Sequence, residues 1–234
     1  MKIFIPLFII VFLLGACKST KLNSISSTKF NSDIRYDSIK DIEGTAYKTV
    51  KIGVQEWMAE NLKTTKYKNG DDIITSMPFD KDLTEDVKPK FQWAYDAQDY
   101  LVVDYGRLYT WYIIEDSRGI CPAGWHVPTN QDWSILALNL GGEKIAGSKL
   151  KEADTLHWGQ SNLSLNTNGF TALPAGFRYN LGAFSNLGDY ASWWTMSDDS
   201  QGNAWIRFVK KDEPLMLMFL NEKNDGHAIR CIKD

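Results

Sequence analysis

The stretch from Cys121 to Trp133 constrains the fold more than any other part of the chain. It reads Cys-Pro-Ala-Gly-Trp-His-Val-Pro-Thr-Asn-Gln-Asp-Trp, and its two prolines and one glycine restrict or redirect the backbone. Thr129 stands where a helix N-cap is preferred, and Leu136 and Leu140 continue the helical spacing that begins at Trp133. The pattern predicts a rigid turn that places a short amphipathic helix on a hydrophobic core.

The amino terminus has the pattern of a lipoprotein signal peptide over residues 1–17. Met1-Lys2 gives a positive start, and an almost wholly apolar run follows from Ile3 to Leu14. A run of about a dozen apolar residues is too short to span a bilayer permanently but suits a secretory leader. Small residues precede Cys17, as a lipoprotein signal peptidase requires, so Cys17 is expected to become the acylated amino terminus. The alternative is an ordinary signal peptide with an incidental cysteine.

Acylation of Cys17 would make membrane lipid a partner of this protein. Lys18 stands where the common inner-membrane retention signal has aspartate, which favours the outer membrane of a diderm bacterium. Residues 18–40 are rich in Ser, Thr, Asn, Asp and Lys and show no sustained period, so they are predicted to form a flexible linker. The remaining residues, 41–234, contain no internal repeat or domain boundary and are expected to form one domain.

Composition and charge narrow the class of protein. Hydrophobic residues make up 44% of the chain and charged residues 24%, which is ordinary for a globular protein. The net charge is -3 and no long Lys/Arg run occurs, so a nucleic-acid partner is not expected. The nine tryptophans indicate either a tryptophan-rich core or rings that line a binding surface.

The domain is predicted to be α+β, with short strands, one or two short helices and long irregular loops. Alternating residues over 41–54 indicate a strand in which Gly53 forms a turn or bulge. The Gly/Asn/Ser-rich region after residue 155 excludes long helices. Four short strands are expected after that region, at 191–196, 204–209, 215–220 and 228–232.

Few residues in this chain fit a catalytic or metal-binding motif. His126, His157 and His227 lack metal-ligand spacing and are interpreted as surface or packing residues. Asp198-Asp199 and Asn224-Asp225 are the nearest candidates for oxygen ligands, and they are interpreted first as turn residues. No nucleophile elbow, phosphate loop or metalloprotease motif occurs, although dispersed carboxylates leave a catalytic pair open. We therefore predict no catalytic residue, no metal site and no cofactor.

A ligand site is expected on the irregular region from about residue 179 to 203, because function concentrates on loops that a rigid scaffold holds. Adjacent strand residues point to opposite faces, so one ring of Trp193 and Trp194 is expected to be buried and the other free to stack. Arg178 and Asp189 would supply hydrogen bonds. The alternative is that these aromatic rings pack the loops onto the core. The predicted contact residues are Arg178, Tyr179, Phe184, Asp189, Tyr190, Trp193 and Trp194.

Eight segments together carry a family resemblance. They are 47–53 (YKTVKIG), 57–62 (WMAENL), 105–111 (YGRLYTW), 121–129 (CPAGWHVPT), 169–170 (GF), 172–178 (ALPAGFR), 193–194 (WW) and 229–231 (IRC). In this order they resemble the Fibrobacter succinogenes major paralogous domain family, over about residues 41–234. That family occurs largely in secreted and lipid-anchored proteins of Fibrobacteres and Bacteroidetes, in agreement with the predicted leader.

The same segments look like a C-type lectin-like fold. The Cys-Pro-x-Gly-Trp opening at Cys121, the glycine-rich loops and the Arg-Cys ending at Cys231 carry this likeness. The piece at 127–133 is similar to the related formylglycine-generating domains. Those enzymes bind copper through a cysteine pair near the chain end, where this chain has only Cys231, and the calcium-loop motifs of lectins are absent. The resemblance therefore implies the architecture and neither activity.

The leading hypothesis is a lipid-anchored cell-envelope protein whose domain binds or adheres without catalysis, with a glycan or a protein as ligand. One alternative is an enzyme, either a divergent formylglycine-generating relative or a carbohydrate-active enzyme. Another alternative is a structural envelope protein without a small ligand.

After processing, Cys121 and Cys231 are the only cysteines left, and an exported location permits a disulfide between them; the alternative is two buried thiols.

We predict that Cys17→Ser leaves the precursor uncleaved and unacylated, because the thiol of Cys17 is the attachment point for the lipid. Metabolic labelling with a fatty acid should give one labelled species in the wild type and none in the variant. Label that still enters the Cys17→Ser protein would show that Cys17 is not the site of lipid attachment.

Overall fold

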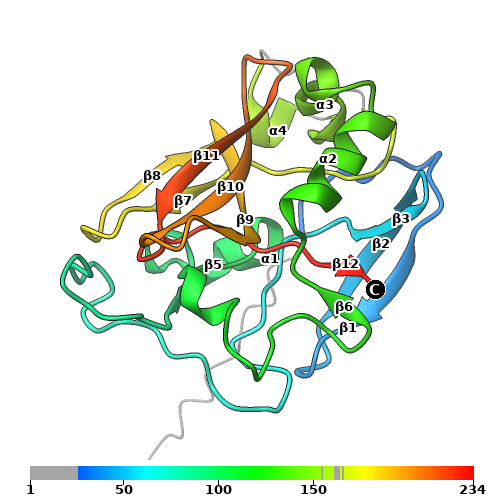
Figure 1. Cartoon of the computed structure of the whole chain (residues 1–234). Helices are drawn as coiled ribbons and strands as arrows, with labels where there is room; N and C mark the ends of the chain where they lie inside the picture. The colour runs from blue at the N-terminus through cyan, green and yellow to red at the C-terminus, as the bar shows by residue number, and fades with distance from the viewer. Residues whose placement is uncertain (1–25, 154, 161–163, 165) are drawn as a thin grey trace, which may run out of the picture.

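The computed structural model describes residues 26–153, 155–160, 164 and 166–234. The predicted signal peptide over residues 1–17, with Cys17, lies outside these residues, as does the first part of the predicted linker. Within the described chain, small sheets are combined with a few short helices, which confirms the α+β class (Figure 1). No helix among the described residues has the length and apolar character needed to cross a membrane.

The first sheet joins both ends of the domain. Its strands, in spatial order, are β1 (Asp37–Lys40), β2 (Ala46–Ile52), β3 (Gln55–Met58), β12 (Ile232–Lys233) and β6 (Trp125–His126), all antiparallel. Gly53, with φ of 62°, lies in the turn between β2 and β3, as the sequence predicts. The C-terminal β12 lies between β3 and β6, so the last residues hold the early and middle parts of the chain together (Figure 1).

The folded part of the chain begins before residue 41. Strand β1 pairs with β2 along its whole length, from Asp37 opposite Thr49 to Lys40 opposite Ala46. Before it, the rings of Phe30 and Tyr36 pack against the core, and Ser27 and Thr28 bond to Asp104. The flexible linker predicted over residues 18–40 is therefore wrong for its described part. Its apolar residues are too widely spaced to show a period, yet each contacts the domain.

A second, three-stranded sheet follows the order β11-β10-β9 and is antiparallel. Its strands are β9 (Tyr190–Asp198), β10 (Asn203–Lys210) and β11 (Met216–Glu222). Three of the four strands predicted near the C-terminus are thus confirmed. The fourth, predicted over 228–232, is a strand only from Ile232 onward, because the preceding residues pass between the two sheets and bond to β9 through Ala228.

The central helix is the one predicted from its cap and spacing. Helix α2 (Asn130–Asn139) starts after Thr129, whose side chain forms a reciprocal capping box with Asp132. Trp133 and Leu136 are fully buried on its inner face. Gly141-Gly142, both with positive φ, end the helix and lead into α3 (Glu143–Leu150). Helix α2 lies between the two sheets (Figure 1).

The other elements are short and serve as connections. They comprise one-turn helices, 3-10 turns and two hairpin-like ladders: α1 (Val102–Tyr105), α4 (Thr155–Trp158), η1 (Tyr95–Ala97), η2 (Asp99–Leu101), η3 (Trp111–Ile113), β4 (Gln92–Trp93) with β5 (Leu108–Tyr109), and β7 (Ala175–Arg178) with β8 (Phe184–Leu187).

The second sheet separates two hydrophobic clusters. Trp193 faces the first cluster, where Trp133 lies 5.4 Å from it and 4.8 Å from Trp57, measured between ring centroids. Trp194 faces the second cluster, together with Ile206. Because alternate residues of a strand point to opposite faces, two adjacent tryptophans each anchor a different core. The sheet is therefore covered on both faces over the central part of β9.

Cys121 and Cys231 form a disulfide, as predicted, with the sulfur atoms 2.03 Å apart. Cys121 precedes β6 and Cys231 directly precedes β12, so the bond lies beside the pairing of these two strands. Both residues are buried in the second cluster.

Replacing both Cys121 and Cys231 by Ala should lower the free energy of unfolding by up to about 4–5 kcal/mol. The bond spans 110 residues, and the chain-entropy model gives about 4.7 kcal/mol for a loop of roughly 100 residues. Urea denaturation with and without reductant measures the effect, and the double variant, which has no bond to reduce, is the control. A wild type that is insensitive to reductant, or that carries two alkylatable thiols, would contradict the prediction.

Candidate functional site

Both tryptophans of the predicted site are buried. Trp193 and Trp194 each have 0% exposure, so the expectation that one ring is free to stack on a ligand is wrong. Their indole nitrogens donate to Asn61 Oδ1 at 2.8 Å and to the Tyr109 carbonyl at 2.7 Å. The two rings do point to opposite faces of β9, but both faces are covered there.

Arg178 is a buried structural residue and does not supply a hydrogen bond to a ligand, which corrects the prediction. Its guanidinium donates to the carbonyl oxygens of Tyr179, Phe79 and Lys81, and it stacks 4.3 Å from the ring of Trp93. Burial lowers its pKa to about 10, so the group remains charged at neutral pH. Arg178 thus fixes the loop at 79–81 against β7.

The remaining predicted residues are divided between packing and surface positions. Tyr179 is 42% exposed and contacts the ring of Phe177, while Phe184 is half-buried against Tyr95. Asp189 and Tyr190 line hollows in the surface, at the start of β9. The structure therefore brings Asp189 and Tyr190 together at the surface, while Arg178 and Phe184 pair across β7 and β8, with the guanidinium 5.8 Å from the ring centroid.

The first hollow is an apolar groove on the second-cluster face of the sheet, with a volume of about 280 Å³. Its walls come from all three strands and from β7. The ring of Phe208 lies 5.9 Å from that of Tyr190 and 5.0 Å from that of Phe219. The residues that line it are Phe177, Tyr190, Ser192, Ile206, Phe208, Lys210, Phe219 and Asn221.

The groove results from the register of the three strands and from a sheet face that is covered at only one end. Phe208 pairs with Ser192 on one side and with Leu217 on the other, so residues two apart on each strand share its face. Toward Trp194 this face is covered by the second cluster, but toward Tyr190 it is open. Phe219, on the edge strand β11, is 49% exposed. The open end thus presents aromatic rings to solvent.

A buried histidine supports the floor of the groove. Ser192 Oγ lies 2.7 Å from His227 Nδ1, and the imidazole stacks on Phe177 and meets Trp194 edge-on. Burial alone lowers the pKa of His227 to about 3, so the ring is neutral at physiological pH. Its Nε2 has no hydrogen-bond partner among the described residues. His227 is therefore a packing residue, in line with its interpretation from the sequence.

The second hollow adjoins the first and is polar, with a volume of about 310 Å³. Lys210 Nζ lies 3.2 Å from Glu213 Oε1, and Lys211 Nζ lies 3.7 Å from Asp189 Oδ1. The residues that line this polar pocket are Asn186, Asp189, Tyr190, Lys210, Lys211, Asp212 and Glu213. It therefore offers alternating hydrogen-bond donors and acceptors.

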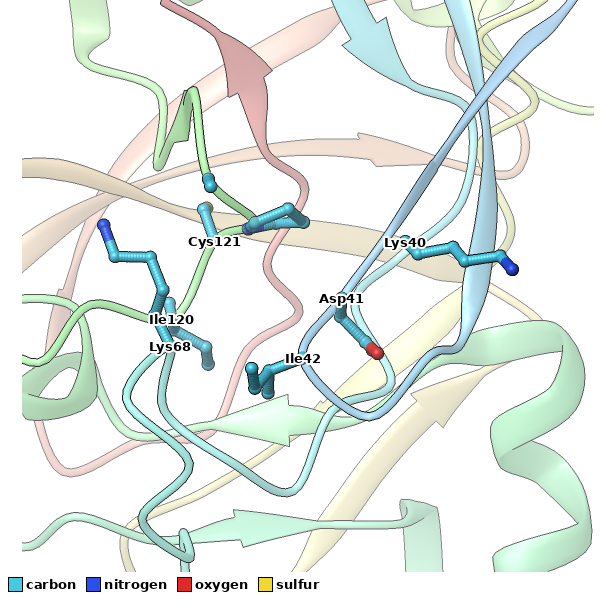
Figure 2. Close-up of a pocket in the computed structure, with 8 residues that line it drawn as sticks. Lys40, Asp41, Ile42, Lys68, Ile120 and Cys121 are labelled. Atoms are coloured by element: carbon cyan, nitrogen blue, oxygen red, sulfur yellow. The ribbon is translucent and has the colours of Figure 1, made fainter.

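A further cavity, of about 230 Å³, lies beside the disulfide (Figure 2). Lys40 and Lys68 line it, but their ammonium groups point away from each other, so they do not converge on an anion. The carboxylate of Asp41 already accepts from the Tyr47 hydroxyl and from the Thr45 amide. This cavity lacks polar groups that converge on its interior.

Ser27, His157 and Glu152 contact one another in the order of a nucleophile, base and acid. Ser27 Oγ lies 3.2 Å from His157 Nε2, and Nδ1 lies 2.6 Å from Glu152 Oε2. Burial lowers the pKa of His157, but hydrogen bonds with Asp104 and Glu152 outweigh it and raise the pKa to about 9. A histidine that is already protonated cannot accept the proton of serine. The cluster instead attaches the N-terminal segment to α1.

The acidic side chains of the described residues do not gather into a metal site. Apart from positions 154, 161–163 and 165, residues 26–234 contain no group of three or more His, Cys, Asp or Glu that could hold a metal ion. Asp199 bonds within its own turn, to Gln201 and Asn203, while Asp225 accepts from the Asn180 amide. The turn interpretation therefore holds for Asp199, whereas Asp198 ends β9 and pairs with Lys223, and Asn224 donates to the carbonyls of Leu83 and Asp86.

The sequence reasoning missed most of the groove, although part of the signal was present. Phe208 and Phe219 lie in strands that were predicted, but pairing register decides whether their rings meet. Aligning the three strands as consecutive hairpins would have placed both rings on one face. Phe177, which the sequence places in a glycine-rich region, gave no such signal.

Comparison with known proteins identifies the domain. Residues 50–233 match the model of the Fibrobacter succinogenes major domain. The matched range runs from β2 to β12 and includes the disulfide, the apolar groove and the polar pocket. Neither the curated proteins nor the solved structures contain a match to the chain.

His157 should make the stability of the fold depend on pH. An unfolded histidine has a pKa of about 6.5, whereas His157 has a pKa of about 9 in the folded protein, so folding takes up a proton between these values. The contribution of His157 to the free energy of unfolding is complete below about pH 6.5 and is lost as the pH rises through about 9. Denaturant unfolding at pH 6, 7.5 and 9.5 measures the free energy of unfolding of the wild type and of His157→Gln. The difference between the two values should narrow as the pH rises. A gap that is constant or widens would contradict a protonated His157.

Proposed function

The chain belongs to the Fibrobacter succinogenes major domain family, and we propose that it is a lipid-anchored cell-envelope protein whose domain binds a ligand without catalysis. The apolar groove is the binding site. The ligand presents a flat apolar face with polar groups at its rim, as the ring of a sugar does. Acylation of Cys17 and an outer-membrane location complete the proposal; the leader sequence and Lys18 support them.

The observation that carries this function is the set of open aromatic rings in the groove. Phe219 is about half exposed and packs on one side against the ring of Phe208, and Tyr190 extends the same surface. Lys210 and Asn221 lie at the border of these rings. Ligand pockets commonly combine an apolar lining with a few polar groups that fix orientation.

We also propose that the domain is a variant of the C-type lectin-like architecture. The proposal is supported by the disulfide from the Cys-Pro-x-Gly-Trp turn to the C-terminal strand, and by the antiparallel second sheet with long connections around it.

The enzyme alternative receives no support from the side chains near the groove. Ser192 and His227 are in contact there, but Ser192 is buried. Asp189, Asp212 and Glu213 lie in the polar pocket, where the first and last pair with lysines. A binding role requires none of these groups to exchange a proton.

Tyr190→Ala and Phe219→Ala should each weaken ligand binding about tenfold or more, which corresponds to about 1.4 kcal/mol, because each removes a ring from the groove. The melting temperature should change little for Phe219→Ala, since this ring is half exposed. A glycan array followed by titration of the hits with wild-type protein provides the measurement.

Leu220→Ala is the matched control for these variants. Leu220 is 41% exposed on the same strand, but it points to the opposite face of β11 and should not affect affinity. The proposed site is wrong if Phe219→Ala binds like the wild type, or if Leu220→Ala weakens binding equally.

A further inference from the structure

The apolar groove and the polar pocket are two parts of one depression. Tyr190 and Lys210 line both, so the two hollows meet at these side chains. The Lys210 ammonium lies 5.6 Å from the ring centroid of Tyr190 and 6.0 Å from that of Phe208. A ligand that leaves the aromatic rings on this side therefore enters the polar pocket directly.

The polar pocket has a fixed floor. The buried ammonium of Lys151 donates to the carbonyl oxygens of Lys211 and Glu213, at 2.6 and 3.0 Å. The Lys211 amide also donates to the Asp189 carbonyl at 2.9 Å. These bonds hold the loop at 211–213 against the start of β9. A pocket that is formed before the ligand arrives loses less conformational entropy on binding.

The charges in the polar pocket favour a neutral ligand. Its two lysines pair with Glu213 and Asp189, and Asp212 adds a further carboxylate. Among the side chains that line the pocket, an anionic ligand would meet three carboxylates and two ammonium groups, and a cationic ligand would have to displace lysines that are already paired. Hydroxyl groups both donate and accept hydrogen bonds, so a polyhydroxylated ligand satisfies ammonium and carboxylate groups together.

The size of the depression favours a ligand with more than one ring. Ligand pockets typically have volumes of roughly 300–1,000 Å³. The apolar groove, at about 280 Å³, and the polar pocket, at about 310 Å³, each lie near the lower limit of that range. Their chemistry also differs, because one suits an apolar ring face and the other suits a set of hydroxyl groups.

We propose that the depression binds a neutral oligosaccharide of at least two units. One sugar ring stacks in the apolar groove, on Tyr190, Phe208 and Phe219, and the next unit forms hydrogen bonds with Asp189 and Lys211 in the polar pocket. This inference rests on the proposed function, because it assigns a ligand class and a second subsite to the same groove.

Titration of the full-length protein with saccharides of increasing length tests the inference. The probes are neutral oligosaccharides of glucose, mannose, xylose and galactose, each with one to six units. Affinity should rise at least tenfold from one unit to two or three units and then level off. Lys211→Met should reduce the affinity for the longer probes toward that of the single unit, and leave the affinity for the single unit unchanged. Tyr190→Ala should weaken binding at every length.

Lys51→Met is the matched control, because Lys51 is an exposed lysine of β2 in the other sheet. It should bind every probe like the wild type. Equal affinity for one and several units, or a Lys211→Met effect that is independent of length, would overturn the second subsite and leave the proposed function intact. Tighter binding of oligogalacturonate than of the neutral probes would overturn the ligand class. If no saccharide binds at all, both this inference and a glycan-binding function are wrong.

Discussion

The buried guanidinium of Arg230 is the interaction on which the rest of the fold depends. It donates to Asn61 Oδ1 and to the Phe170 carbonyl, and lies 4.2 Å from the ring centroid of Phe170. Asn61 Oδ1 also accepts from the indole of Trp193, and its Nδ2 donates to the Tyr105 carbonyl. Burial lowers the pKa of Arg230 to about 9, so it remains charged and needs these partners. Removing one partner of such a buried charge is far more costly than breaking a surface pair.

This network joins segments that are widely separated in the sequence. The network has contributions from five segments, at 57–62, 105–111, 169–170, 193–194 and 229–231. The side chains of Arg230, Asn61, Phe170 and Trp193 are all buried, so the network belongs to the core of the domain. The groove lies elsewhere, on the open end of the second sheet, where side chains can vary without disturbing the Arg230 contacts.

Local features of the fold could be predicted from sequence, and long-range ones could not. The cap at Thr129 and the spacing after it are local, so the helix over 130–139 is confirmed; the same holds for the three alternating strands of the second sheet. Alternation also placed Trp193 and Trp194 on opposite faces, but whether a face is covered depends on segments distant in sequence. The sequence does not show that Arg178 is buried, because the carbonyl groups that it bonds to are identified only by the fold.

The described N-terminal segment has a consequence for where the ligand can lie. Ser26 and Ser27 bond to Asp104, so the chain is attached to the domain from this point onward. About nine peptide units separate Cys17 from Ser26, and at about 3.6 Å each they span at most roughly 30 Å. A domain of this length has a radius of gyration of about 17 Å and hence a diameter of roughly 45 Å. On the proposed acylation of Cys17, no part of the groove can be farther than roughly 80 Å from the membrane. A saccharide bound in the groove, as proposed, would therefore belong to the envelope or be brought to its surface.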